Sequence, residues 1–298
     1  MGRVAAGVLF VTVLAAAGCG GGGGSSSNAD SIASLLKRPG PEVAGTPGAG
    51  DFVPGPIRYP FAVIDNEGRA IERPTAEVWV ATGRDTKPFA HTIAKLEPIG
   101  VPGESKPALG GLTRIYVVHF KVPKAGRYWF VAEPKGAKIQ AVTVLDVQSH
   151  LPLPSVGAKA AVSATPTLSS APATALTTAR PPDLGLLHYS IASSLKAHAP
   201  FVVTFATPKF CTSRTCGPVV DVVDAVRKQF TASPVRFIHV EVYTNNNPAK
   251  GYNRWMRQWG LSSEPWTFLV GSDGRIKAEF QGSVSAAELT AAIRQHLL

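Results

Sequence analysis

Two cysteines, Cys211 and Cys216, lie where a predicted strand over residues 201–206 gives way to a predicted helix. The helix begins at Cys216 and carries valines on one face at helical spacing. A thiol at a helix N-terminus faces unpaired N–H groups and the positive end of the helix dipole, which lowers its pKa. Because the cysteines are five positions apart, they could also close a small disulfide loop. The pair therefore indicates thiol–disulfide chemistry.

The third cysteine, Cys19, indicates where the protein is located. Residues 1–18 have the features of a secretory signal, with Arg3 followed by an apolar run that is too short to span a bilayer as a mature helix. The AAGC segment that ends at Cys19 resembles a bacterial lipoprotein lipobox, which implies cleavage before Cys19 and acylation of its sulfur. An ordinary secreted protein is the alternative. Under the lipobox interpretation the protein is lipid-anchored at the extracytoplasmic face of the cell membrane. Under both interpretations it leaves the cytoplasm for a compartment in which disulfides persist.

The composition of the chain allows two folded cores. It has 298 residues, of which 45% are apolar, and a net charge of +10. Nucleic-acid binding is not expected, because no basic stripe with interleaved aromatic residues is present. Segments rich in Gly, Pro, Ser and Ala separate the apolar blocks and predict linkers. The predicted segments are a signal peptide (1–18), a lipidated tether (19–51), a β-sandwich domain (52–147), a linker (148–185) and an α/β domain (186–298).

The block over residues 52–147 predicts an all-β domain. Runs of β-branched and aromatic residues alternate with turn residues, and short turns favour antiparallel pairing in a sandwich of immunoglobulin or fibronectin type. We expect Trp79 and Trp129 to pack in the core of this sandwich. His91 and His119 have no second ligand at suitable spacing, so no metal site is predicted.

The tail from His188 onward predicts the element order α-β-α-β-α-β-β-α. In this context Cys216-Gly217-Pro218 resembles the first part of the thioredoxin active site, and the EPWTF segment around Pro265 resembles the segment that carries the cis-proline of membrane-tethered extracytoplasmic thioredoxins. The resemblance covers a little over a third of the chain. It implies an α/β thioredoxin-like fold and no cofactor. One departure is that Val219 stands where the family has its second cysteine.

Thiol–disulfide exchange in such a domain would give individual residues distinct roles. Cys216 would be the nucleophile and Cys211 the resolving partner, although the two roles could be exchanged. Gly217, Pro218 and Pro265 would support the site, and Arg214 between the thiols would stabilise a thiolate. The partners would be thiols and disulfides of exported proteins, together with a redox partner that restores the pair.

Two other interpretations of the cysteine pair stay open at this point. A permanent Cys211–Cys216 bridge would make the chain a non-catalytic surface lipoprotein whose β-sandwich binds a partner. Copper handling would need a distant histidine such as His239, but a single histidine on a buried strand is more often a hydrogen-bonded core residue. Trp255 and Trp259 are predicted to cover the sheet.

Overall fold

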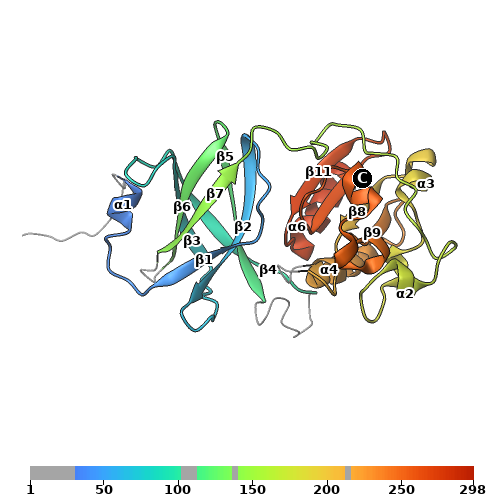
Figure 1. The fold of residues 1–298 in the computed structure, drawn as a ribbon, viewed down its shortest axis with the longest axis horizontal. Coiled ribbons are helices and arrows are strands. Elements are labelled where there is room, and N and C mark those ends of the chain that lie inside the picture. The colour runs from blue at the N-terminus through green and yellow to red at the C-terminus, as the bar shows by residue number, and fades with distance from the viewer. Residues whose placement is uncertain (1–30, 102–112, 136–139, 212–215) are drawn as a thin grey trace, which may run out of the picture.

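The computed structural model describes residues 31–101, 113–135, 140–211 and 216–298, and it contains two sheets that lie side by side (Figure 1). The strands of the first sheet are β1 (Val43–Pro47), β2 (Gly55–Asp65), β3 (Thr75–Ala81), β4 (Ala90–Pro98), β5 (Arg114–Val122), β6 (Gly126–Pro134) and β7 (Ala141–Val147). Those of the second sheet are β8 (Phe201–Phe205), β9 (Arg236–Val240), β10 (Trp266–Val270) and β11 (Ile276–Gln281). The α-helices are α1 (Ile32–Leu35), α2 (Ala173–Leu176), α3 (Ile191–Lys196), α4 (Cys216–Gln229), α5 (Arg254–Gln258) and α6 (Ala286–His296). Short 3-10 helices cover Leu184–Leu186, Thr244–Asn246 and Pro248–Lys250.

The first sheet is a closed barrel with the strand order β1-β2-β5-β4-β3-β6-β7. Inward-facing residues such as Phe61, Tyr116 and Phe130 form an aromatic core, in which Phe61 and Phe130 meet edge to face with ring centroids 5.0 Å apart. The expectation of β-structure is confirmed for this block, but the sheet closes on itself instead of dividing into two sheets. Closure depends on β1, which pairs with β2 and touches β7 at Ala44 and Val142.

The outer face of the barrel differs from the expectation in two respects. Trp79 is buried, but its neighbours Val78 and Val80 face the barrel core, so Trp79 points to the opposite side. There it packs against Ile32 and Leu35 of α1, which is drawn in blue at one end of the barrel in Figure 1. The predicted tether over 19–51 is therefore folded from residue 31 onward, because α1 covers this apolar face and β1 completes the barrel. Residues 1–30, which include the predicted signal and Cys19, lie outside the described residues.

The second sheet has the order β11-β10-β8-β9, with β8 parallel to β9 and antiparallel to β10. The elements along the chain are α3, β8, α4, β9, α5, β10, β11 and α6, which is the predicted order and gives a thioredoxin-like topology. The strand β8 is completely buried, as its continuous apolar sequence requires. Sequence pattern alone was sufficient for this part of the fold.

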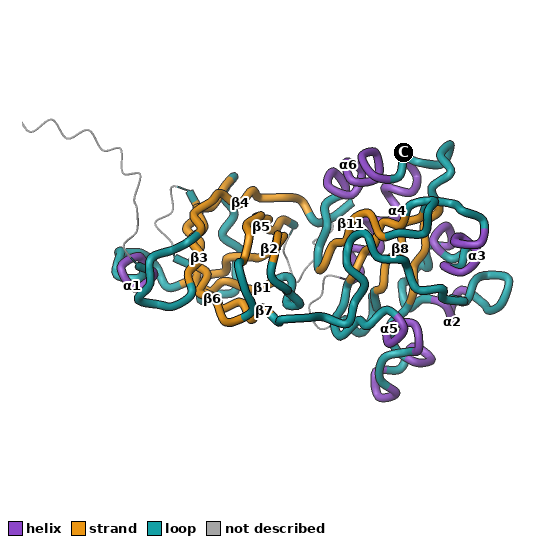
Figure 2. Tube along the Cα trace, turned by 90° about the horizontal axis from the view of Figure 1, so that it is seen from above, coloured by secondary structure: helices purple, strands orange, loops and turns teal. Residues whose placement is uncertain are grey.

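Helices cover both faces of the second sheet. On one face α4 and α6 pack against Val202 and Leu269, and the predicted valine face of α4 is buried there. On the other face α3 and α5 pack against Phe201 and Phe268 together with the buried Trp259. Figure 2 shows α6 and α5 on opposite sides of this sheet. The arrangement confirms that Trp259 covers the sheet.

The predicted linker over residues 148–185 is packed on the second sheet instead of standing free. The backbone of 157–160 hydrogen-bonds to the outer edge of β11, with Ala160 N–H donating to the Gly274 carbonyl (2.9 Å) and Ile276 N–H donating to the Ala158 carbonyl (2.9 Å). Ser163 and Thr177 are buried. A composition rich in Gly, Pro, Ser and Ala does not predict this packing, because the segment is held by backbone pairing and by small residues that fit close to the sheet.

A half-buried ion pair joins the barrel to the second sheet. Arg58 on β2 donates two hydrogen bonds of 2.9 Å to the carboxylate of Glu288 on α6 and one of 2.8 Å to the Ser283 carbonyl. Burial alone would raise the pKa of Glu288, but the hydrogen bonds and charge of Arg58, with the Ser285 N–H, hold the pKa below its ordinary value. A capping box opens α6, in which Ser285 and Glu288 exchange hydrogen bonds of 3.1 Å. The carboxylate thus serves the helix cap and the junction together.

Candidate functional site

The helix α4 begins at Cys216, as the sequence predicts. It runs antiparallel to β8, so its first turn lies at the end of the sheet where the carboxyl terminus of β8 is. Gly217 and Pro218 are half-buried in this turn, where proline is tolerated because the first N–H groups of a helix lack intrahelical partners. Residues 212–215, which include Arg214, and the side chain of Cys216 lie outside the described residues.

Cys211 lies in the loop between β8 and α4. Its side chain is half-buried and packs against the cluster that contains Val219 and Val222 of α4. The loop is attached to the segment before the first 3-10 helix, because the Lys209 N–H donates to the Thr178 hydroxyl (3.1 Å). The structure thus places Cys211 against the buried cluster to which the helix that Cys216 begins contributes its valines.

Pro265 stands at the start of β10, and the Glu264–Pro265 peptide bond is cis. The register pairs Trp266 with Phe205, so Pro265 lies across from the residue that begins the Cys211 loop. Pro265 is buried, and its carbonyl accepts a hydrogen bond from the Gly282 N–H (2.9 Å). The backbone of Pro265, the Cys211 loop and the first turn of α4 therefore lie at the same end of the sheet.

A cleft of about 740 Å³ adjoins this end of the sheet. One wall is the face of α4 opposite the buried valines, and the others come from the 174–183 segment and the Cys211 loop. Its lining residues are Val101, Thr174, Thr178, Ala179, Arg180, Pro181, Asp183, Pro208, Lys209, Phe210, Gly217, Asp221, Asp224, Ala225, Lys228 and Asn246. The cleft was not expected from the sequence. The helical spacing of Asp221, Asp224 and Lys228 gives one wall, whereas nothing in the sequence brings the 174–183 segment to it.

Asp183 is an acid of this cleft whose pKa is raised. Burial, followed by the charges of Asp224 and Asp221, raises its pKa from 3.8 to about 6. One of its carboxylate oxygens is shielded from solvent and has no hydrogen-bond partner among the described residues. Asp224 is also buried, but it is paired with Arg227 (2.7 Å) and Lys228 (2.8 Å). The cleft therefore holds an acid whose pKa is raised toward neutrality by burial and by neighbouring carboxylates.

Another buried carboxylate, that of Glu241, is connected to the Cys211 loop. Glu241 follows β9, and one of its oxygens accepts hydrogen bonds from the Thr178 N–H (2.5 Å) and the Thr178 hydroxyl (2.6 Å). The same hydroxyl accepts from Lys209 in the Cys211 loop. Glu241 thereby connects the end of β9 to the loop, a role that its position in the sequence did not reveal.

The comparisons with known proteins identify similarity to solved structures. No family model matches the chain, and no curated protein matches it. Among solved structures, the chain is similar to a thiol:disulfide interchange protein of the thioredoxin family from Chlorobium tepidum. The two are 17% identical, the match covers 51% of this chain and 100% of that chain, and the TM-score is 0.31.

Two of the histidines considered in the sequence, His239 and His91, make contacts within the protein. His239 Nε2 lies 3.0 Å from the Ala206 carbonyl, so this nitrogen donates a hydrogen bond inside the core. His91 stacks on Trp79 and lies 3.3 Å from Glu77. Within the described ranges, no group of three or more His, Cys, Asp or Glu side chains is arranged to hold a metal ion, and no helix combines the length and apolar character needed to cross a bilayer.

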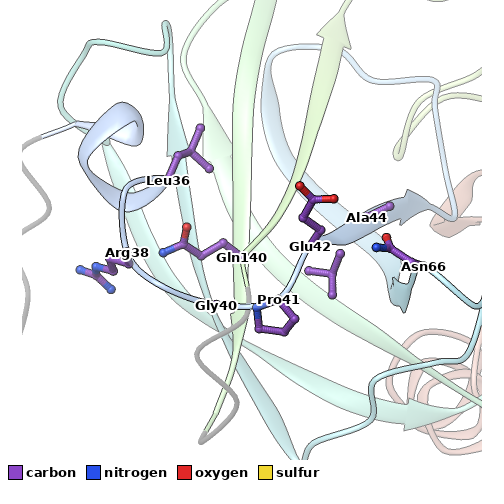
Figure 3. Close-up of a pocket in the computed structure, with 9 residues that line it drawn as sticks. Leu36, Arg38, Gly40, Pro41, Glu42, Ala44, Asn66 and Gln140 are labelled. Carbon is purple, nitrogen blue, oxygen red and sulfur yellow. The ribbon is translucent and has the colours of Figure 1, made fainter.

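A separate hollow of about 450 Å³ lies on the barrel near α1 (Figure 3). Arg38 and Glu42 lie on the segment that leads from α1 to β1, and Gln140 precedes β7. Arg38 is already paired with Glu133 (3.1 Å). The hollow contains neither described cysteine, so it is independent of the thiol site.

Proposed function

We propose that the chain carries out thiol–disulfide exchange through Cys216, with Cys211 as its resolving partner, on exported proteins. One observation carries the proposal. The helix start at Cys216 lies at the same end of the sheet as the half-buried Cys211 and the backbone of Pro265. A helix N-terminus favours the thiolate form of a cysteine there. The adjoining cleft gives room for a polypeptide beside this end of the sheet.

The reaction consists of two exchange steps. The Cys216 thiolate attacks one sulfur of a substrate disulfide, so that a bond between Cys216 and the substrate forms while the substrate S–S bond breaks and one thiolate leaves. The Cys211 thiolate then attacks the sulfur of Cys216, which closes the Cys211–Cys216 disulfide and releases the second substrate thiolate. Two electrons pass from the dithiol to the substrate. A partner dithiol restores the pair, and the reverse sequence oxidises a substrate dithiol.

We further propose the setting in which this chemistry takes place. The sequence before residue 31 supports cleavage ahead of Cys19 and attachment of lipid to its sulfur, which would hold the protein at the extracytoplasmic face of the bacterial membrane. The barrel and the thioredoxin-like part would then act as two domains of one tethered protein, joined through the Arg58–Glu288 contact. An oxidising compartment outside the cytoplasm is compatible with disulfide exchange.

One observation favours a second function, in which the Cys211–Cys216 pair is a permanent bridge in a non-catalytic lipoprotein. Cys211 packs against the buried cluster around α4, an environment in which a structural bond would be shielded. The bridge would then hold the loop to the helix, and the barrel would bind a partner.

The reduction potential of the pair distinguishes the two functions. We expect the Cys211–Cys216 couple, measured in the full chain with Cys19→Ala so that only two thiols titrate, to lie above about −300 mV. The measurement is equilibration with dithiol buffers followed by alkylation and mass determination. A potential well below about −300 mV would identify a structural bond and would reject the exchange function.

A further inference from the structure

A short segment of the barrel over residues 48–52 is held firmly to the barrel itself. The Gly48 N–H donates to the Pro60 carbonyl on β2 (2.8 Å), and the Phe52 side chain is buried in the barrel core. The Phe52 carbonyl also accepts from the Gln148 N–H (2.8 Å). Residues between these two anchors are therefore fixed by the barrel, although they point toward the second sheet.

The polar groups of this segment bind the loop that precedes Pro265. Gln281, the last residue of β11, accepts from the backbone N–H groups of Gly50 (3.1 Å) and Asp51 (3.0 Å). Its amide nitrogen donates to the Asp51 carboxylate (3.0 Å) and to the Ser263 hydroxyl (3.0 Å). The Ser263 hydroxyl donates to the same Asp51 oxygen and accepts from the Trp266 indole N–H (3.2 Å). Asp51 is thus the barrel carboxylate on which the loop is fastened.

The other side of Pro265 is held by close packing. Gly282 adopts a φ of +72°, and a Cβ atom at this position would lie 2.0 Å from the Gly48 carbonyl oxygen. The Gly282 N–H donates to the carbonyl of Pro265. Only glycine lets the two backbones approach this closely. The barrel segment consequently touches both the residues before Pro265 and the residue that binds its carbonyl.

We propose that Asp51 is a positioning residue for the 263–265 loop, and that through it the barrel sets the affinity of the thiol site for extended polypeptide substrates. The inference rests on the proposed function, because an extended substrate would pair with the backbone beside Pro265 during exchange. A fastened loop presents that backbone in one conformation, so less conformational entropy is lost when a peptide binds. A small disulfide makes no such backbone contact and does not depend on the loop.

The test compares two substrates in the full chain. Asp51→Ala is expected to raise the KM for a disulfide-containing peptide by about tenfold, because hydrogen bonds to a charged carboxylate are lost, while kcat changes less than about twofold. The rate with a small aromatic disulfide is expected to stay unchanged. Asp51→Asn keeps an acceptor oxygen for Ser263 and should restore much of the lost affinity; it also serves if the alanine variant folds poorly. The control is Glu288→Gln, which weakens the neighbouring ion pair without touching the loop and should leave the peptide KM unchanged.

The outcomes separate this inference from the proposed function. If the wild type reacts with both substrates and Asp51→Ala leaves the peptide KM unchanged, the positioning role is overturned and the exchange function stands. Equal losses with both substrates, or equal losses in Asp51→Ala and Glu288→Gln, would also overturn it, because the effect would then lie in the fold. A wild type inert to both substrates would overturn the exchange function, and the inference with it.

Discussion

Replacing Cys216 with serine is expected to abolish the reduction of a model disulfide, with a loss of at least about a thousandfold in rate. The reason is that the proposed reaction has a single attacking sulfur at the start of α4, and a serine hydroxyl at the same place cannot form the mixed disulfide. The measurement is the turnover of a disulfide substrate by the full chain in a Cys19→Ala background. That background variant is also the control and should keep full activity.

The Cys211→Ser variant is expected to differ from Cys216→Ser in which exchange step it loses. Cys211→Ser should lose sustained turnover but keep the first exchange step, because the attacking thiol is unchanged and only release of the product is blocked. A Cys216→Ser variant that turns over at the rate of its parent would contradict the assignment of the nucleophile. The same holds if Cys211→Ser alone lost the first step.

The second large effect concerns stability, and it depends on Glu279 in β11. Burial raises the pKa of Glu279 from 4.5 to about 7, and its Oε2 atom has no hydrogen-bond partner among the described residues. Below pH ~4.5 the carboxyl group is neutral in both the folded and the unfolded chain. As the pH rises toward about 7, the unfolded chain ionises more readily, so the free energy of unfolding falls.

Glu279→Gln removes this ionisation. A shift from 4.5 to about 7 corresponds to up to about 3 kcal/mol, so the variant should exceed the wild type in stability by as much as that above pH ~7.5. The two proteins should converge near pH ~4.5. Denaturant unfolding at both pH values is the measurement, and Glu67→Gln, at a turn where the side chain is 65% exposed, is the control. A difference of the same size at both pH values would show that the ionisation of Glu279 is not the cause.

The part of the fold around the cysteines could be predicted from sequence because its signals are local. The continuous apolar run of β8, the valine face of α4 and the Ser285–Glu288 capping box each depend on neighbouring residues. The barrel strands β1 and β4 gave weaker signals. β1 contains Gly45 and Pro47, and β4 places the apolar Ile93 on its exposed face, so the apolar residues of neither strand follow the alternation expected for a strand with one buried face.

The contacts that surround the candidate site could not be predicted in this way. Asp51 and Gln281 are 230 positions apart, and Glu241 meets Thr178 across 63 positions. Such pairs arise only after the barrel and the 148–185 segment have packed on the second sheet. Small polar residues, which composition assigned to a linker, make these contacts through backbone groups and hydroxyls. The sequence pointed to Cys211, Cys216 and Pro265 as candidates, but not to the groups that hold their loops.

The most direct test of the exchange function is the position of the covalent adduct in a Cys19→Ala, Cys211→Ser chain that is incubated with a disulfide-containing peptide. Proteolysis and mass spectrometry locate the attached peptide, and the double variant Cys19→Ala, Cys216→Ser is the matched control. We predict a mixed disulfide on Cys216 that a small dithiol releases, and none in the control. The absence of an adduct on Cys216, or its appearance only on Cys211 in the control, would contradict Cys216 as the attacking thiol.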